Sequence, residues 1–288
     1  MKKYYFLVLL TIGCVQLQAQ GELGFGFKAG LNFSTMDGAL ETDAQGNELE
    51  SVEYSTGFSV GALLNYSITD IFGLRGEFIY SQKGRTINFD GPSYFIFDAT
   101  GDRIVALGDR SVSADVLNSY LEIPILGYAK FGKIEIMGGA YVAGLINSVA
   151  DGTMRFSPSS QAGTNFTELP FTLDYRYQRD NPGEGRGEVT PYSINGIGID
   201  VPSTLGAYYE YSMVEKNLYN FLDFGLIGGL SFYLSDGFFV NARLEYGLTD
   251  TTDDDKDVAY AGLANNQFIF RDDINRNFAI HTSVAFRF

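Results

Sequence analysis

Apolar and polar side chains alternate along most of this chain with a period of two residues. In residues 24–34 every second side chain is apolar, from Phe25 to Phe33, and glycine or polar residues stand between them. The same alternation recurs at 57–67, 72–89, 119–131, 134–148, 220–234, 238–248 and 278–288. Because successive side chains of a β-strand point to opposite faces of a sheet, this pattern predicts eight strands, each with one apolar and one polar face.

Short and long connections alternate between the predicted strands. A few residues join the second strand to the third, the fourth to the fifth and the sixth to the seventh. The other connections are long and cover residues 35–54, 90–116, 149–218 and 250–275. Outer-membrane barrels combine short periplasmic turns with long outer loops. We therefore predict an all-β fold, a closed antiparallel transmembrane β-barrel of about eight strands in the bacterial outer membrane.

A soluble β-sandwich also alternates apolar and polar residues, and it is the main alternative fold. The predicted strands run for about ten residues or more, which is long for a soluble sheet but suits a tilted membrane crossing. After the first 20 residues no window holds about 18 consecutive apolar residues, so helical membrane spans are not expected. The barrel is therefore favoured.

The N-terminus has the three-part layout of a secretory signal peptide. Lys2 and Lys3 precede an apolar run at 4–15, and polar and small residues follow it as far as Ala19. We predict cleavage after Ala19, which makes residues 1–19 a signal peptide and residues 20–288 the barrel domain. A permanent anchor would need a longer apolar run.

Cys14 is the only cysteine of the chain, and it lies in the segment that we expect to be removed. The mature protein would then have no disulfide and no thiolate site. A lipoprotein cleavage box around Cys14 is the alternative, but Thr11 stands where such boxes usually carry leucine.

Charged residues recur on the polar face of the predicted strands, which would point into the barrel. Buried charges are tolerated when opposite charges compensate them, so an interior network of ion pairs is expected. Its predicted members are Arg75, Glu77, Glu122, Glu135, Asp223, Arg243 and Glu245. The same face also carries Lys28, Lys83, Arg85 and Arg287. The sequence Arg-x-Glu occurs twice, and its two charged residues lie on the same face of a strand. It offers the network the pairs Arg75 with Glu77 and Arg243 with Glu245.

An eight-stranded barrel is just wide enough for its own side chains, so we interpret this network as structural filling rather than as a path for protons or ions. Inward glycines such as Gly139 and Gly229 would leave room for the bulky charged residues opposite. The outward face carries aromatic residues near strand ends, as interfacial girdles do: Phe25, Tyr66, Phe72, Phe131, Phe238 and Phe288.

The chain is acidic, with a formal net charge of −15, so nucleic acid is not an expected partner. Carboxylates gather in the last long connection, at Asp250, Asp253, Asp254, Asp255 and Asp257. Hard divalent cations favour such ligands, but the spacing fits no EF-hand, and a solvated loop is favoured. We expect no cofactor, because the sequence carries no phosphate-binding glycine loop, no zinc spacing and no catalytic carboxylate pair.

Three segments of the chain resemble one known family. They are KAGLNFS at 28–34, YLEIPI at 120–125 and VAFRF at 284–288. These segments are similar to motifs of the PorT-like outer-membrane β-barrel proteins of Bacteroidetes, over about residues 20–288. The resemblance implies the barrel fold and the outer membrane, and it would explain why a strand tolerates Pro124.

Together these observations favour a non-enzymatic protein with a structural or surface-interaction role through its long outer loops. The expected partners are outer-membrane lipid and lipopolysaccharide, a protein at the outer loops, and the barrel-assembly machinery. The resemblance implies that this machinery reads a C-terminal signal formed by Val284, Phe286 and Phe288. The third long connection is rich in aromatic residues, which suit strand extensions more simply than a binding surface: Phe171, Tyr175, Tyr177, Tyr192, Tyr208, Tyr209 and Tyr211.

Three other functions stay open at this point. One is a small porin or transport channel, and another is an accessory barrel of a secretion system, because a subset of the resembled family is similar to components of type IX secretion. The third is a lipid hydrolase that would use His281 and Ser283, which share a strand face. No third catalytic partner follows them, so an interior histidine with satisfied contacts is favoured.

Overall fold

The structure is a computed structural model that describes residues 22–99, 102–160, 163–212 and 217–288. These residues form thirteen β-strands. None of them belongs to a helix with the length and apolarity that a membrane crossing requires. The predicted signal peptide at 1–19, its cleavage site and Cys14 lie outside the described residues.

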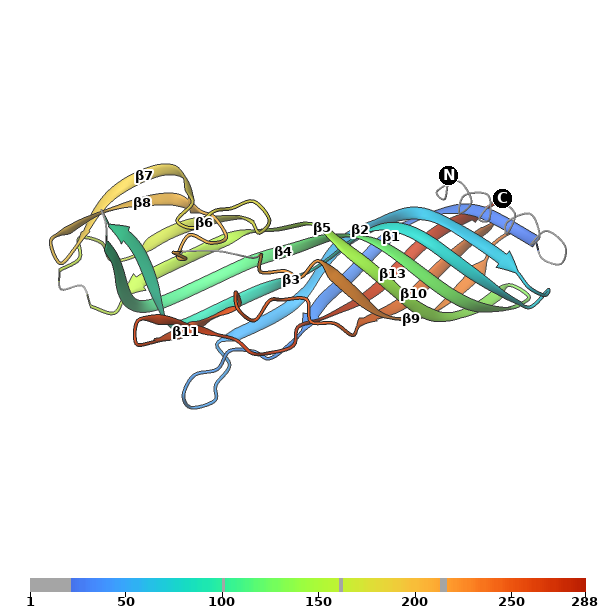
Figure 1. Cartoon of the computed structure of the whole chain (residues 1–288), viewed down its shortest axis with the longest axis horizontal. Helices are drawn as coiled ribbons and strands as arrows, with labels where there is room; N and C mark the ends of the chain where they lie inside the picture. The colour runs from blue at the N-terminus through green and yellow to red at the C-terminus, as the bar shows by residue number, and fades with distance from the viewer. Residues whose placement is uncertain (1–21, 100–101, 161–162, 213–216) are drawn as a thin grey trace, which may run out of the picture.

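Eight of the strands close on themselves into a ring (Figure 1). Each is antiparallel to both neighbours in the order β1, β2, β3, β4, β5, β9, β10 and β13, and β13 pairs again with β1. The bounds are β1 Glu22–Asp37, β2 Glu50–Ser67, β3 Phe72–Ala99, β4 Asp102–Phe131, β5 Ile134–Pro158, β9 Leu222–Tyr233, β10 Phe238–Gly247 and β13 Arg276–Arg287. The ring therefore has the eight antiparallel strands that the alternation predicts.

Tight turns join ring strands at one end of the molecule. They cover residues 68–71, 132–133 and 234–237. Gly132 has a φ of 62°, a left-handed conformation that glycine adopts without steric cost. The start of β1 and the end of β13 lie at this end too, because Glu22 faces Ser67 of β2 and Gly26 faces Arg287. We call it the turn end.

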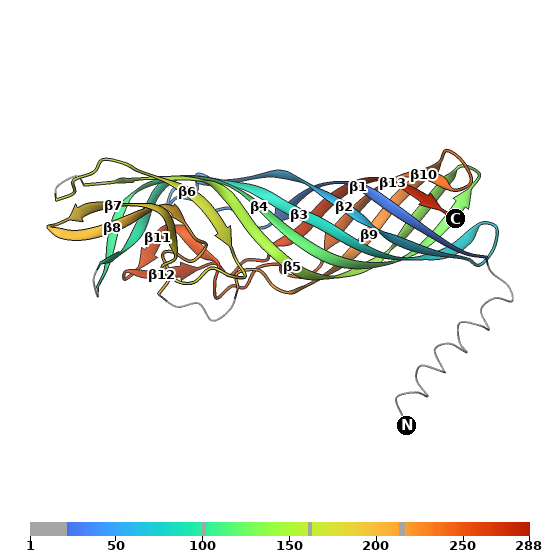
Figure 2. The ribbon, with the colours of Figure 1, turned by 90° about the horizontal axis from the view of Figure 1, so that it is seen from above.

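At the other end, β3, β4 and β5 run on beyond the ring, and three further strands join the same eleven-stranded sheet there (Figure 2). We call this part the extension: residues 90–99, 102–118 and 148–158 together with β6 Leu169–Arg176, β7 Gly185–Ile194 and β8 Ile197–Leu205. A hairpin of β11 Val258–Ala264 and β12 Gln267–Phe270 lies beside it, and Tyr94 of β3 donates to the carbonyl of Ala259 over 3.0 Å. Much of 90–116 and 149–218, which we expected to be loop, is therefore strand.

The apolar side chains of the shared strands lie on opposite faces in the ring and in the extension. In the ring, apolar side chains point outward, and Phe25 and Ile125 are 60 % and 65 % exposed. In the extension, apolar side chains point inward and form one core: Phe89, Phe95, Phe97, Val112, Ala114, Met154, Phe156, Phe166, Leu169, Phe171, Leu173, Ile194, Ile199, Val201, Leu205 and Tyr209. The ring thus suits an apolar surrounding, whereas the extension folds as a water-soluble sheet does.

Pro124 lies inside β4, where a proline has no N–H to give to a sheet. The pairing of β3 with β4 is interrupted there, because Gly76 faces Ile125 and the next pair is Ile79 with Glu122. On its other side Pro124 faces Tyr141 of β5. The strand tolerates the proline at a gap in one of its two ladders.

Candidate functional site

The ring interior holds the polar residues of all eight strands, and glycines make room for the largest of them. Arg243 of β10 faces Gly229 of β9. A β-carbon at Gly229 would come within 2.6 Å of the β-carbon of Arg243, so only glycine fits there. Gly229 therefore leaves room for Arg243, as the sequence predicts.

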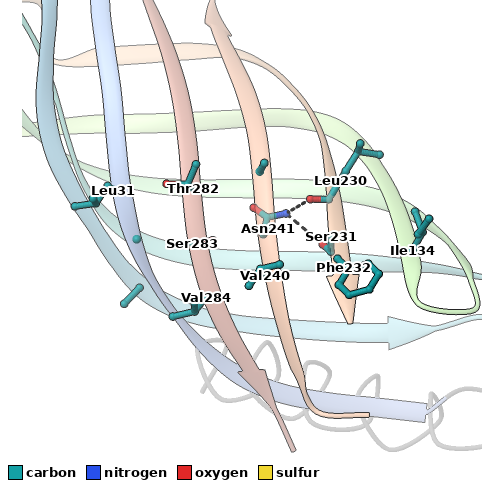
Figure 3. A pocket seen from close by; sticks show the side chains of 13 residues that line it. Leu31, Ile134, Leu230, Ser231, Phe232, Val240, Asn241, Thr282, Ser283 and Val284 are labelled. Atoms are coloured by element: carbon teal, nitrogen blue, oxygen red, sulfur yellow. Dashed lines mark hydrogen bonds between the residues drawn. The ribbon is translucent and has the colours of Figure 1, made fainter. Parts of the chain in front are cut away.

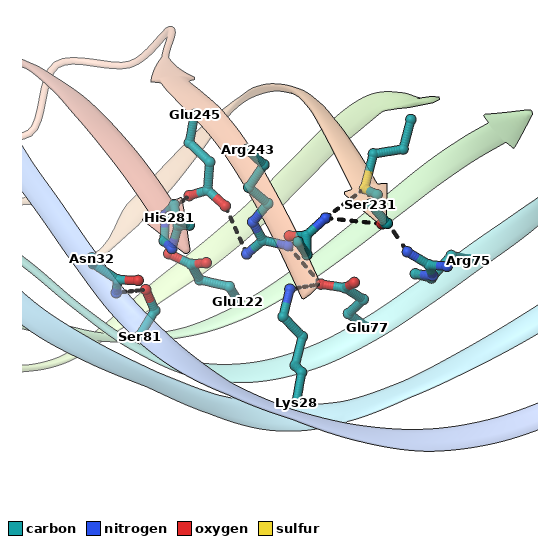
Figure 4. A network of polar contacts seen from close by, with 12 residues as sticks. Lys28, Asn32, Arg75, Glu77, Ser81, Glu122, Ser231, Arg243, Glu245 and His281 are labelled. Atoms are coloured by element: carbon teal, nitrogen blue, oxygen red, sulfur yellow. Dashed lines mark hydrogen bonds and ion pairs between the residues drawn. The ribbon is translucent and has the colours of Figure 1, made fainter. Parts of the chain in front are cut away.

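A chain of ion pairs crosses the middle of the ring (Figure 4). Lys28 Nζ of β1 lies 3.0 Å from Glu77 Oε2 of β3, and a guanidinium nitrogen of Arg243 lies 2.7 Å from the same oxygen. The other end of that guanidinium lies 2.8 Å from Glu245 Oε1. These side chains are at most 4 % exposed. We call them, with Lys83, Glu122 and His281, the central network.

Lys83 joins the remaining acids of the central network. Its Nζ lies 2.6 Å from Glu122 Oε1 and 2.9 Å from Glu245 Oε2, and 4.3 Å from the centre of the Tyr141 ring. Both ends of the lysine–glutamate contacts are fully buried. Alternation places Lys83 on the inward face, but its role as the junction of two carboxylates depends on which strands meet across the ring, which a single sequence does not reveal.

A second cluster lies nearer the turn end. Arg75 lies 2.8 Å from Glu135 Oε1, and its Nε donates to Asn65 over 2.6 Å. Tyr233 and Ser231 also donate to Glu135, over 2.8 Å and 3.1 Å. Arg75 therefore pairs with a residue of β5 rather than with Glu77, its same-face neighbour on β3. That part of the Arg-x-Glu prediction is wrong, whereas the contact between Arg243 and Glu245 is present.

Asp223, another predicted member, has neutral partners. It accepts hydrogen bonds from Tyr141, Thr249 and Asn277, over 3.0, 2.7 and 2.9 Å. Its charge is therefore compensated by three donors rather than by a cation. Of the seven predicted members, the structure joins Glu77, Glu122, Arg243 and Glu245 in the central network, places Arg75 and Glu135 in the second cluster, and leaves Asp223 apart.

His281 belongs to the central network, and its contacts bear on the hydrolase alternative. Its Nε2 lies 2.8 Å from Glu245 Oε2. Ser283 Oγ has no hydrogen-bond partner among the described residues, so it is not bonded to the histidine. A nucleophile and its base need such a bond or a close approach to it. The geometry therefore gives the hydrolase alternative no support.

Arg271 ties together the loops at the end of the ring opposite the turns. Its guanidinium lies 3.1 Å from Glu50, 3.8 Å from Glu41 and 3.0 Å from Asp273. Glu41 in turn accepts from the backbone N–H groups of Tyr260 and Ala261, both over 2.8 Å. The first and last of the long connections are thereby joined over the mouth of the ring.

The acidic residues of 250–257 accept hydrogen bonds from backbone N–H groups, as when Asp255 N–H donates to Asp253 Oδ1 over 3.1 Å. Asp250 accepts from the backbone N–H groups of Thr252 and Asn275. Burial raises the pKa of Asp257 to about 6, although Arg271 and Arg85 lower it. Among residues 22–99, 102–160, 163–212 and 217–288, no three carboxylate, histidine or cysteine side chains are gathered as a metal site would need.

The outer wall of the ring is apolar around its circumference. The terminal Val284, Phe286 and Phe288 point outward on it and are 49 %, 46 % and 75 % exposed. A hollow of about 650 Å³ lies over β1, β13, β10 and β9, and Leu31, Leu230 and Val284 stand at its rim (Figure 3). A depression with such a lining fits an acyl chain better than a polar ligand.

A protein family described as "outer membrane protein beta-barrel domain" has a model that matches residues 16–253. No curated protein matches the chain.

Several solved structures are similar to the chain over almost its whole length. The attachment invasion locus protein Ail of Yersinia pestis is 11 % identical with a TM-score of 0.35, and the match covers 93 % of this chain and 99 % of that one. Neisserial surface protein A is 10 % identical with a TM-score of 0.35, covering 92 % and 97 %. OprG of Pseudomonas aeruginosa is 9 % identical with a TM-score of 0.36, covering 94 % and 98 %.

Proposed function

Since this chain belongs to the outer membrane protein beta-barrel domain family and is located in the bacterial outer membrane, we propose that it is a non-enzymatic barrel that presents its extension outside the cell. In this role the ring is the anchor, and the extension is the part that meets partners.

The observation that carries the proposal is that the ring has a filled, charged interior, whereas the extension has an apolar core of its own. The ring interior is occupied by paired charges that are almost fully buried, such as Lys83 with Glu122 and Arg243 with Glu77. An interior filled in this way leaves little room for a solute, which supports an anchor over a channel. The extension has its own apolar core, and so it can hold a fixed surface away from the membrane.

The orientation follows from the turns. Outer-membrane barrels keep their short turns in the periplasm and their long connections outside. The turns at 68–71, 132–133 and 234–237 would then be periplasmic, and the extension and the mouth tied by Arg271 would face the exterior.

Two rows of outward aromatic residues support a membrane crossing by the part of the ring between the turn end and the mouth. Phe25 and Phe288 lie near the turn end, and Phe278 and Tyr246 lie near the mouth. Ten residues separate Phe278 from Phe288, which at about 3.4 Å per residue and a tilt near about 40° corresponds to about 26 Å along the ring axis. That distance matches the apolar band of an outer-membrane barrel.

The narrower kinship with PorT-like proteins is part of the same proposal. It rests on the segments at 28–34, 120–125 and 284–288, of which the second places Pro124 at the gap between β3 and β4. An accessory role in secretion would follow from that kinship, with the extension as the docking part.

Accessibility of epitope tags on intact cells tests the proposal. One tag is inserted at Gly196, in the turn between β7 and β8, and a matched tag at Gly237, in the turn between β9 and β10. We expect an antibody to reach the tag at Gly196 on intact cells and the tag at Gly237 only after the outer membrane is permeabilised. The opposite result would reverse the orientation and refute presentation of the extension.

A further inference from the structure

We propose that a hollow on the outer wall, immediately beyond the mouth-side aromatic row, binds a sugar of a glycolipid in the outer leaflet. The hollow measures about 400 Å³ and lies across β2, β3, β4 and β5. It is lined by Tyr54, Ser55, Thr56, Thr86, Asp115, Leu117, Val149 and Asp151. The inference rests on the proposed function, because it needs the extension to face the exterior.

The position of Tyr54 places the hollow at the level of lipid headgroups. Its ring packs edge to face against Phe278, with 6.4 Å between ring centres, and Phe278 faces Tyr246 across β13 and β10. These three residues form the aromatic row at the mouth side of the apolar wall, and such rows mark the membrane–water interface. Figure 1 shows β3, β4 and β5 continuing past this level into the extension.

The strands bring carboxylates into opposition at this level. Asp115 of β4 faces Asp151 of β5, and Asp151 faces Asp174 of β6. Like charges directly opposite each other destabilise a sheet unless something compensates them. Thr86 donates to Asp115, and Arg176 lies 2.9 Å from Asp174. The side chain of Asp151, which is exposed, has no hydrogen bond or ion pair among the described residues, so its carboxylate oxygens are open to a donor from outside.

The lining selects a sugar rather than a phosphate. None of its eight residues is lysine or arginine, and two are carboxylates, which repel an anion. Carboxylates only accept hydrogen bonds, and sugar hydroxyls donate them. The ring of Tyr54, 56 % exposed, offers an aromatic face for the C–H groups of a pyranose.

The side of the hollow nearest the ring is apolar, so a sugar bound there can belong to a lipid. Leu117 and Val149 face each other across β4 and β5 and lead to the apolar wall, where Leu121 and Ile123 are exposed. Acyl chains of the same molecule would lie against that wall. The occupant is therefore a membrane glycolipid and not a free oligosaccharide.

The test measures binding of fluorescently labelled rough lipopolysaccharide to the refolded full chain by anisotropy. The micelles are of an amine-oxide detergent, because a glycosidic detergent would itself offer sugars to the hollow. We expect Tyr54→Ala and Asp151→Asn each to weaken binding about tenfold, as loss of one charged hydrogen bond or stacking contact does. The matched controls Tyr246→Ala and Asp109→Asn should change it less than about twofold.

Heat-modifiable migration in gels shows that each variant is folded before binding is measured. Equal losses in Tyr246→Ala and Tyr54→Ala, or unchanged binding in Asp151→Asn, would overturn the site. Binding that disappears in EDTA would replace the sugar contact by a cation bridge and overturn it as well. Core oligosaccharide released from the lipid should compete poorly, and competition as strong as that of the intact glycolipid would refute the membrane source.

This assay does not depend on orientation. If the tags show the extension in the periplasm while binding in micelles behaves as expected, the proposed function and the outer-leaflet source of the glycolipid both fail, and only the sugar-binding hollow stands. If the tags show the extension outside and the variants bind normally, the site fails alone.

Discussion

At the scale of single residues, the ring interior illustrates how buried charges are held. Lys83 contacts two glutamates from different strands, and Arg243 joins two more carboxylate oxygens. Removing one partner from such a group leaves a buried charge without compensation, which costs more than the pair itself contributes.

Lys83→Met should therefore destabilise the ring strongly. The loss leaves Glu122 and Glu245 without their shared cation, and we expect about 3–5 kcal/mol from urea titrations of the refolded protein. Lys130→Met is the control, because Lys130 is only half-buried and contacts the Tyr233 ring at 3.9 Å. A loss of similar size in both variants would show that the lysine side chain, rather than its ion pairs, matters.

The raised pKa of Asp257 predicts that the stability of the loops at the mouth depends on pH. Its pKa of about 6 in the folded protein lies above the ordinary 3.8, so folding disfavours its charged form. The resulting penalty is absent below the ordinary pKa of 3.8, grows as the pH rises toward about 6 and is fully present above it. We expect Asp257→Asn to stabilise the 250–275 segment by up to about 2 kcal/mol at about pH 8 and hardly at all at about pH 4. Protease susceptibility of this segment measures it, and a gain that is equal at both pH values would contradict it.

At the scale of elements, the extension behaves as a separate core built on shared strands. Phe95 stacks on Phe171 with 5.1 Å between ring centres and packs against Phe156 at 5.6 Å. Glu210 fixes this part of β3 to β4, because it accepts a hydrogen bond from the N–H of Ile96 over 3.0 Å and pairs with Arg110 at 2.8 Å. We expect this core to loosen without breaking the pairings of the ring.

Phe95→Ala should expose the extension to proteases while the ring stays folded. Truncation of a buried phenylalanine costs about 3–5 kcal/mol. We expect cleavage within 90–116 and 149–218, together with unchanged heat-modifiable migration of the ring. Leu107→Ala, at a side chain 64 % exposed, should change neither property. Unfolding of the ring in Phe95→Ala would show that the two parts are one cooperative unit.

The ring strands were predictable because their alternation is long and both faces are uniform. The extension was predictable only in part, for reasons that particular residues show. Gly91 and Pro92 have the composition of a turn, yet they lie inside β3, which continues through them. From Phe89 onward the inward face of β3 carries apolar core residues instead of charged ones, as Phe95 and Phe97 do. The aromatic residues of 171–211 indicated strand extensions there, and β6 to β8 are those strands.

The interior site was predictable by membership but not by pairing. Alternation identifies which side chains point inward, and all seven predicted members are buried. Which of them meet depends on strands distant in sequence, as Glu77 and Arg243 are, and on partners such as Tyr233 for Glu135. The same limit explains why Arg75 was assigned to Glu77 instead of Glu135.

At the scale of the whole molecule, the filled ring predicts the electrical behaviour of the protein. We expect the refolded chain to insert into a planar bilayer without stable single-channel openings, because the central network crosses its interior. Stable, reproducible conductance steps would make transport the leading function and would refute the anchor role. A purified porin added to the same bilayer is the positive control.

The seam between β1 and β13 has a consequence for how the protein comes to be folded. Gly26 faces Arg287 and Asp37 faces Arg276, so the seam joins segments about 250 residues apart. Contacts of such long range form slowly, since the intervening chain must first be organised. Until they form, β1 and β13 each present an open row of peptide groups that can pair with another chain. An unsealed intermediate is therefore prone to aggregate, and an assembly factor would have to protect that pair of edges.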